Sequence, residues 1–256
     1  MRNLKVEICY KGSRYHGYQY QINALSIQEL LEKAASKILQ ENVRINGCSR
    51  TDTGVHANSY FFNVLTDSKI QCEGFVKGMN TMLPNDIAVL YCTDENEDFH
   101  ARFSSVGKHY IYKIWNGKVR NPFYENAALM YPYKLADDKL REAAGIFEGT
   151  HDFTSFCAAA SDVLDKTRTV YKINVNRNGN LVEIDFFGDG FLHNMVRIIV
   201  GTMLFYNEGK FTLEDLKSML KVPDRTKAGK TASADGLYLN KVYYNKEEMQ
   251  SDIAGG

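Results

Sequence analysis

The sequence lacks the features of a membrane or secreted protein. Its 256 residues contain no apolar run of about 18 residues, the length that a membrane-spanning helix needs. Residues 1–17 carry charges throughout and hold no apolar signal-peptide core. We therefore expect a protein that stays in the cytosol and contacts no membrane. A composition of 44% hydrophobic and 24% charged residues is typical of a soluble globular protein.

Metal and disulfide motifs are also missing. The five cysteines are odd in number and never form a Cys-x-x-Cys pair, and the six histidines never form a His-x-x-x-His pair. The chain has no nucleotide-binding motif either. We expect reduced, mostly buried thiols, no metal and no cofactor. The cysteines are Cys9, Cys48, Cys72, Cys92 and Cys157.

The chain has no net charge, because 31 basic residues balance 31 acidic ones. The total therefore gives no sign of a nucleic-acid partner, but the basic residues are clustered. Such clusters can build a basic face on a neutral protein. For any single cluster, a solvated loop is the more ordinary explanation. The clusters are Lys108, Lys113, Lys118 and Arg120, and Lys221, Arg225, Lys227 and Lys230.

Apolar periodicity predicts an α+β fold with a strand–helix–strand plan that occurs twice. We expect an N-terminal α/β half over residues 1–105, a C-terminal α/β half over 106–246 and a flexible tail over 247–256. In the first half the pattern predicts strands over 4–10, 43–48, 58–65 and 87–91 and helices over 27–39 and 75–82. In the second half it predicts strands over 109–115, 170–175, 181–187 and 236–243 and helices over 140–147, 191–206 and 213–220.

Turn and cap signals refine this plan. Asn116-Gly117 and Asn178-Gly179-Asn180 are hairpin-type turn signals. Ser26 with Glu29, and Thr212 with Asp215, have the spacing of a helix N-terminal cap. Asp137 or Asp138 is expected to cap the helix over 140–147.

The stretch Gly47–Ala57 concentrates polar residues between two predicted strands. Arg50 and Asp52 are two residues apart, so their side chains point the same way if the backbone is extended. Gly54 permits a turn or a close backbone approach. One explanation is a surface turn in which Asp52 bonds its own backbone. The other is a functional carboxylate, which two anchored ends would aim.

Two further segments leave alternatives open. The helix over 191–206 is apolar nearly all round, which indicates burial, yet it carries Arg197. Its guanidinium either pairs with a carboxylate or lies at a helix edge with its head in water. The aromatic loop over 14–21 either stacks nucleic-acid bases or packs as a surface loop.

The segment from Ser49 to Ala57, SRTDTGVHA, resembles the signature of the TruA-type tRNA pseudouridine synthases. That family usually has Gly and Ala where this chain has Ser49 and Thr53. Three more blocks follow in the family's order, with Ser233 where the family usually has Pro. Four ordered motifs over about 200 residues are a far stronger signal than any one of them. The further blocks are 99–103 with 110–114, 191–197 with Gly201, and 232–239.

The resemblance implies an isomerase that needs no cofactor and has its active cleft between two α/β halves with antiparallel-rich sheets flanked by helices. It implies Asp52 as nucleophile, Tyr110 packing on the target base, and Arg197 as the ion-pair partner of Asp52. Arg50 would help to displace the base. The expected partners are tRNA, modified at positions 38, 39 and 40 of the anticodon stem-loop, and a second copy of the chain. The substrate-binding residues that we expect are Tyr110, Arg50, His56, Arg14, Lys108 and Leu237, with Lys113, Arg168, Lys227 and Lys230 as further candidates for phosphate contacts.

Several alternatives stay open at this level. Asp52 could attack either the ribose or the base, and Tyr110 could accept the C5 proton or serve only as a stacking platform. A non-catalytic tRNA-binding protein would share the basic and aromatic residues but gives no reason for Asp52 beside Arg50. A hydrolase acting on the nucleoside bond would release free uracil instead of returning it to the sugar.

Overall fold

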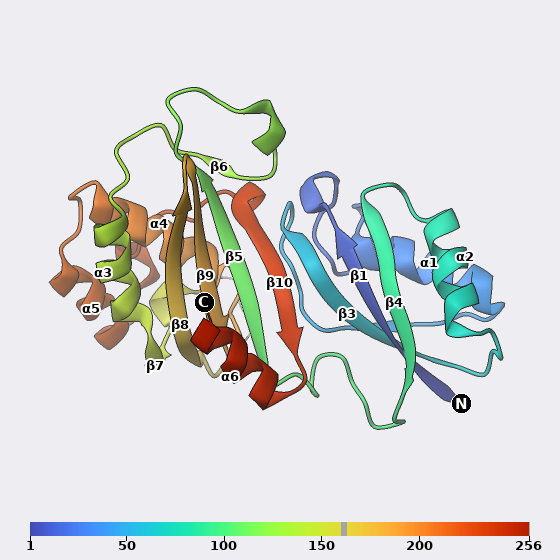
Figure 1. Ribbon diagram of the computed structural model, residues 1–256. Coiled ribbons are helices and arrows are strands. Elements are labelled where there is room, and N and C mark those ends of the chain that lie inside the picture. Colours follow the sequence, from blue (N-terminus) through green and yellow to red (C-terminus); the bar gives the residue numbers. More distant parts are fainter. Residues whose placement is uncertain (160–162, 256) are drawn as a thin grey trace. The chain divides into compact units, whose positions relative to one another are not determined.

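The computed structural model describes residues 1–159 and 163–255. The chain forms two compact units (Figure 1). The first comprises Met1–Val106 and Tyr238–Asn245, and the second comprises Gly107–Leu237 and Lys246–Gly256. The division at Val106 is next to the boundary that we expected after residue 105, but residues 238–245 return to the first unit.

A mixed sheet forms the core of the first unit, in the strand order β4-β1-β3-β10, with β2 added beside β3. Strand β1 is antiparallel to β3 and β4, and β10 runs parallel to β3. Leu4, Val6 and Ile8 of β1 are buried, as alternation predicted. The strands are β1 Arg2–Tyr10, β2 Ile45–Gly47, β3 His56–Thr66, β4 Ile87–Glu95 and β10 Leu237–Tyr243.

Two amphipathic helices complete the first unit. They are α1 (Ile27–Leu39) and α2 (Cys72–Met82). Ser26 caps α1 by accepting the Glu29 N–H at 3.3 Å. Helix α1 buries residues at helical spacing along one face, and it contacts α2, which itself contacts β4 (Figure 1).

An antiparallel sheet forms the core of the second unit, in the order β5-β9-β8-β7, with β6 parallel to β5. Helix α4 is buried around most of its surface and contacts α3 and β5. The strands are β5 Gly107–Trp115, β6 Leu129–Met130, β7 Gly149–Asp152, β8 Thr167–Asn178 and β9 Leu181–Gly188. The helices are α3 Asp137–Phe147, α4 Met195–Asn207, α5 Leu213–Lys221 and α6 Lys246–Gly255.

The predicted α+β class, with antiparallel-rich sheets flanked by helices, is confirmed. The turn around Gly179 is confirmed as well: Asn178 pairs with Leu181 across β8 and β9, and Gly179 has φ +59°. Thr212 and Asp215 form the full capping box of α5. All five cysteines are free thiols, and Cys48, Cys92 and Cys157 are buried. Within residues 1–159 and 163–255, the helices are all too short or too polar to cross a membrane.

Two predicted local features are wrong. Asn116-Gly117 does not form a hairpin, because the next strand, β6, runs parallel to β5. Instead the Asn116 amide donates to the Tyr131 and Tyr133 carbonyls, at 2.7 and 2.9 Å, and braces a long loop. Helix α3 is capped at Ala136, so Asp137 and Asp138 lie in its first turn, where the helix dipole favours carboxylates.

The start of α4 and the structure of the last residues also differ from the expectation. Helix α4 begins at Met195 rather than Phe191, because Asn194 has a left-handed backbone with φ +62°. The residues expected to be a flexible tail form α6, as far as Gly255. Its Met249 is only 6% exposed and packs against Gly107, which gives this helix a fixed contact.

Candidate active site

Hydrogen bonds hold both ends of the Asp52 loop, the connection between β2 and β3 in the first unit. The Tyr60 hydroxyl donates to the Ser49 carbonyl at 2.5 Å, near the start of the loop. Near its end, the Gly54 N–H donates to the Tyr15 carbonyl at 3.3 Å, and the Val55 N–H donates to the Asp52 carbonyl at 3.1 Å and closes a turn. Asp52 itself is half-buried. The loop therefore has the anchoring that the flanking strands predicted.

Thr51, next to Asp52, is fixed from two sides. It is buried, and its Oγ1 lies 2.8 Å from the Tyr10 hydroxyl of β1. Its carbonyl accepts the Tyr18 N–H at 3.1 Å. Tyr15 and Tyr18 are 2% and 3% exposed, so these two rings of the loop over 14–21 pack inside the unit and cannot stack on bases in this conformation.

Two glycines allow the backbone to approach the Asp52 loop closely. A Cβ on Gly12 would lie 1.9 Å from the Val55 carbonyl oxygen, and one on Gly17 would lie 2.7 Å from the Thr51 carbonyl oxygen. Gly54, inside the loop, has φ +83°, a conformation that glycine adopts without strain. A side chain at Gly12 or Gly17 would therefore displace the segment that carries Asp52.

His56 lies in the interior at the end of the loop. It is 1% exposed, and its Nδ1 accepts the Gly12 N–H at 3.1 Å. Its ring stacks on Tyr238, with 4.5 Å between centroids and 21° between planes. These contacts support the loop and β10, so the substrate contact expected for His56 stays a prediction.

The cationic residues expected to bind substrate in the first unit are on its surface. Arg50 is exposed in the same loop as Asp52. Arg14 is exposed, and its Nη1 lies 3.3 Å from an Asp86 carboxylate oxygen. The Tyr15 hydroxyl donates to the same carboxylate at 2.5 Å. Burial raises the pKa of Tyr15, and this hydrogen bond raises it further. The first unit thus places Arg50 and Asp52 on one loop, and His56 follows it as the first residue of β3.

In the second unit, Tyr110 lies on β5 with its ring held against Phe191. The two ring centroids are 5.2 Å apart and the planes are nearly perpendicular, at 79°. Tyr110 is 6% exposed, and Lys108, two residues earlier on the same face of the strand, is half-buried. Leu237 is 5% exposed at the start of β10.

The Arg197 guanidinium is bonded within the second unit and does not extend freely into water from a helix edge. Its Nε donates to the Ala232 carbonyl at 2.8 Å, and its Nη1 donates to Asn194 Oδ1 at 2.7 Å. The Ala232 N–H donates in return to the Arg197 carbonyl at 3.1 Å. The segment that contains Ala232 therefore lies directly against the start of α4.

Tyr112 lies in the surroundings of Arg197, and the sequence pattern did not indicate a role for it. Its hydroxyl donates to the Ser233 carbonyl at 2.8 Å and ties β5 to the segment after Ala232. Burial raises the pKa of Tyr112 above its ordinary value, and the nearby charge of Arg197 opposes this. The sequence signal available for it was its position two residues after Tyr110, on the same face of the strand.

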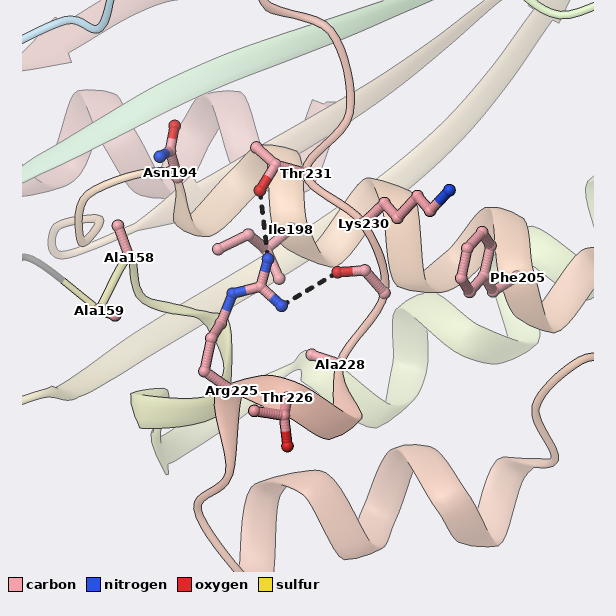
Figure 2. Close-up of a pocket in the computed structure, with 11 residues that line it drawn as sticks. Ala158, Ala159, Asn194, Ile198, Phe205, Arg225, Thr226, Ala228, Lys230 and Thr231 are labelled. Carbon is pink, nitrogen blue, oxygen red and sulfur yellow. Dashed lines mark hydrogen bonds between the residues drawn. The ribbon is translucent and has the colours of Figure 1, made fainter.

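A cavity of about 620 Å³ lies beside the start of α4 (Figure 2). Arg225 crosses it, and its guanidinium donates to the Gly229 carbonyl at 3.1 Å and to Thr231 Oγ1 at 3.2 Å. Asn194 lies in the wall of this cavity (Figure 2). Arg225 therefore braces the segment that leads to Ala232.

The remaining phosphate-contact candidates in the second unit differ in their partners. Lys113 Nζ lies 3.1 Å from Glu183, so its charge is partly neutralised. Arg168 donates to the Thr167 carbonyl at 2.6 Å and to that of Asp165 at 3.1 Å. Lys227 and Lys230 are exposed.

Comparison with known proteins supplies the wider context. A family model described as tRNA pseudouridine synthase matches residues 143–245. The tRNA pseudouridine synthase A of Thermoanaerobacter sp. strain X514 is 43% identical over 244 residues, 95% of this chain and 100% of that protein. The chain belongs to the tRNA pseudouridine synthase A family. Its Geobacillus kaustophilus relative is 39% identical over 256 residues, 100% of this chain and 99% of that protein.

Other members of the tRNA pseudouridine synthase A family match to a similar extent. The one from Clostridium acetobutylicum is 43% identical over 244 residues, 95% of this chain and 100% of that protein. A solved structure of a Cbf5-Nop10-Gar1 complex matches with a TM-score of 0.36 and 12% identity, over 92% of this chain and 57% of the other. The identity to the tRNA pseudouridine synthase A proteins extends over both compact units.

Proposed function

We propose that this protein is a tRNA pseudouridine synthase that isomerises uridine at positions 38, 39 and 40 of the anticodon stem-loop, with Asp52 as nucleophile. The observation that carries the proposal is the 39–43% identity to proteins of that name over nearly the whole chain. The anchored loop with Arg50 and Asp52 supports the choice of nucleophile.

The reaction places few demands on the protein. The bond between ribose C1′ and uracil N1 breaks, C1′ joins C5, the C5 proton leaves and N1 regains a proton. Because nothing is oxidised and no group is donated, one carboxylate suffices to form and resolve a covalent intermediate. Asp52 can attack C1′ of the ribose or C6 of the base, and either attack satisfies this balance.

Arg197 and Tyr110 complete the proposed machinery. A guanidinium held in a fixed direction favours the ionised form of a carboxylate and orients it, and this is the role we propose for Arg197 toward Asp52. Tyr110, with its ring fixed edge-on to Phe191, is suited to pack on the target base. A phenol with a pKa near 10 is a weak base at neutral pH, so stacking is the role we favour for Tyr110 over acceptance of the C5 proton.

The substrate must also be opened. Moving a base out of its stack costs a few kcal/mol, and we propose that exposed Arg50 helps to displace it. Exposed basic residues such as Lys227 and Lys230 would contact phosphates, which makes binding weaker at high salt. We further propose that the protein acts in the cytosol as a homodimer, as its family resemblance implies. Light scattering at several protein concentrations would measure the number of copies.

The decisive experiment is tritium release from tRNA labelled at uridine C5. We expect release by the wild type, and RNA binding without release by Asp52→Ala and Asp52→Asn. Asp138→Asn is the matched control, because the Asp138 side chain is fully exposed, and it should release tritium like the wild type. Release by Asp52→Ala at the wild-type rate would contradict the assignment. Free uracil in the products would indicate a hydrolase, and binding without release by the wild type would indicate a non-catalytic RNA-binding protein.

A further inference from the structure

Asn194 precedes α4 in a backbone conformation that few residues adopt. Its φ and ψ are +62° and +5°, in the left-handed region. Asparagine tolerates this region better than other residues with a Cβ, yet still less well than glycine. Residues in unfavourable conformations persist where the surrounding structure holds them, and they are often found at functional sites. The role of the Asn194 side chain is therefore informative.

The Asn194 side chain does not perform the usual task of its position. An asparagine at the N-cap ordinarily accepts a backbone N–H from the first turn of the helix. Within α4, which the structure describes throughout, the Asn194 side chain caps no backbone N–H. Its Oδ1 accepts instead from the Nη1 of Arg197, three residues later, at 2.7 Å. The capping acceptor is thus used to hold a guanidinium.

The Ala232 carbonyl, which accepts from Arg197 Nε, is itself held rigidly. The Gly229 N–H donates to Thr202 Oγ1 of α4 at 2.9 Å. A Cβ on Gly201 would lie 1.8 Å from the Lys230 carbonyl oxygen, so this segment lies directly on the helix backbone. Arg225 braces the same segment from the cavity side (Figure 2). The Ala232 carbonyl therefore keeps its place relative to α4.

We propose that Asn194 is a positioning residue that sets the direction of the Arg197 guanidinium for the isomerisation of uridine. Bonds at Nε and Nη1 to two separate acceptors fix both the plane and the direction of the group, which a long arginine side chain would otherwise sample widely. Loss of the Asn194 acceptor removes one of these two constraints on the guanidinium. The expected effect of Asn194 on turnover rests on the proposed function, whereas its expected effect on the Arg197 guanidinium does not.

Three variants separate the acceptor from the backbone. Asn194→Gly keeps the left-handed backbone and removes Oδ1, whereas Asn194→Asp keeps an acceptor at the same place. Asn126→Gly is the matched control, because Asn126 also has a positive φ, of +52°, and lies in another loop of the second unit. We expect kcat for tritium release to fall about 10- to 100-fold in Asn194→Gly, with KM for tRNA within about twofold of wild type. Asn194→Asp should recover most of this loss, and Asn126→Gly should match the wild type.

A second readout does not depend on catalysis. In ¹⁵N spectra of arginine side chains, rotation of the Arg197 guanidinium should be less restricted in Asn194→Gly than in the wild type, while the signal of Arg177 stays unchanged. Wild-type kcat together with unchanged Arg197 signals in Asn194→Gly would overturn the inference. Equal loss of kcat in the Gly and Asp variants would also overturn it, because the acceptor would then not be what matters. If the wild type releases no tritium, the proposed function fails, and the Arg197 signals alone decide whether Asn194 orients that residue.

Discussion

The Asp52 loop and the start of α4 are held in different ways. Around Asp52, the bonds described above fix the backbone and the neighbouring residues, through Ser49, Thr51 and the close approach of Gly12 and Gly17. At the start of α4, the bonds are made by the functional side chain itself, because Arg197 donates to Asn194 and Ala232.

The difference matches the tasks that we propose for the two residues. A nucleophile must move through bond formation and bond breaking, so it is served by a rigid backbone beneath it. A cation that only provides a directed charge is served by a fixed head group. Loss of the bonds to Asn194 and Ala232 should therefore act through Arg197, and shifts of the loop backbone should act through Asp52.

The largest effect is expected from Arg197→Leu. Removal of a fixed charge aimed at the reacting group should lower kcat about 10²- to 10³-fold while the protein stays folded. Arg197→Lys keeps the charge but cannot donate to Asn194 and Ala232 in the same planar geometry, so it should also be strongly impaired. Steady-state kinetics and thermal melting test this together. Loss of folding in both variants would show that Arg197 is structural.

Gly12→Ala tests the backbone side of the comparison. A Cβ there would lie 1.9 Å from the Val55 carbonyl oxygen, so the Asp52 loop must shift. We expect a loss of about 1–3 kcal/mol of unfolding free energy and a lower kcat. Gly74→Ala in α2 is the control, because its Cβ would make only an ordinary contact at 3.4 Å. Urea denaturation measures the first effect, and equal results for the two variants would contradict the prediction.

Thr51→Val is a milder change in the same loop. It keeps the shape of the side chain and removes the bond to the Tyr10 hydroxyl, which should cost about 1–2 kcal/mol of unfolding free energy. A double-mutant cycle with Tyr10→Phe isolates this bond from other contacts. If the two changes prove strictly additive, the bond contributes nothing to the loop.

Much of the first unit could be predicted from the sequence because its signals are local. Alternation predicted β1, and the predicted strands on both sides of the polar motif indicated an anchored Asp52 loop. The bond between Tyr10 and Thr51 spans 41 residues, so no local pattern encodes it. The packing of Tyr15 and Tyr18 against this loop depends on the same long-range arrangement.

The surroundings of Arg197 were less predictable for a physical reason. Apolar residues lie on both sides of His193 and Asn194, so the apolar pattern alone placed the helix start too early, at Phe191. The start depends on the backbone of Asn194, which is stabilised by a side-chain bond to Arg197. The Ala232 carbonyl comes from 35 residues away and carries no sequence signature, because any residue supplies a carbonyl.

The Asp137–Arg177 pair contrasts with Arg197 and its acceptors Asn194 and Ala232. Arg177 is held by a carboxylate, and it lies outside the proposed site. The Arg177 guanidinium donates to both Asp137 oxygens and holds the pKa of Asp137 below its usual 3.8. When folding lowers the pKa of a carboxyl group, its ionised form stabilises the fold at a pH above the pKa of the unfolded state. This stabilisation is lost as the pH falls through the pKa of the folded state.

Asp137→Asn should therefore lower the unfolding free energy at pH 6 by about 1 kcal/mol and leave kcat unchanged. The deficit relative to wild type should close as the pH falls below 3.8. Urea denaturation at pH 6 and at lower pH measures both. A deficit that persists unchanged in acid would show that the effect does not come from the ionised pair.

Gly145→Ala should have the smallest effect, and an opposite sign. Gly145 is exposed inside α3, and apart from its chain neighbours and the backbone of its own helix no described heavy atom lies within 4 Å of a Cβ built there. Alanine in a helix interior is favoured over glycine by about 0.5–1 kcal/mol, so the unfolding free energy should rise by that amount. Because α3 contacts α4, an unchanged kcat would show that added stability alone does not alter the Arg197 site. A changed kcat would mean that turnover follows the overall stability of the second unit, and the losses predicted for Asn194→Gly would then need correction for stability.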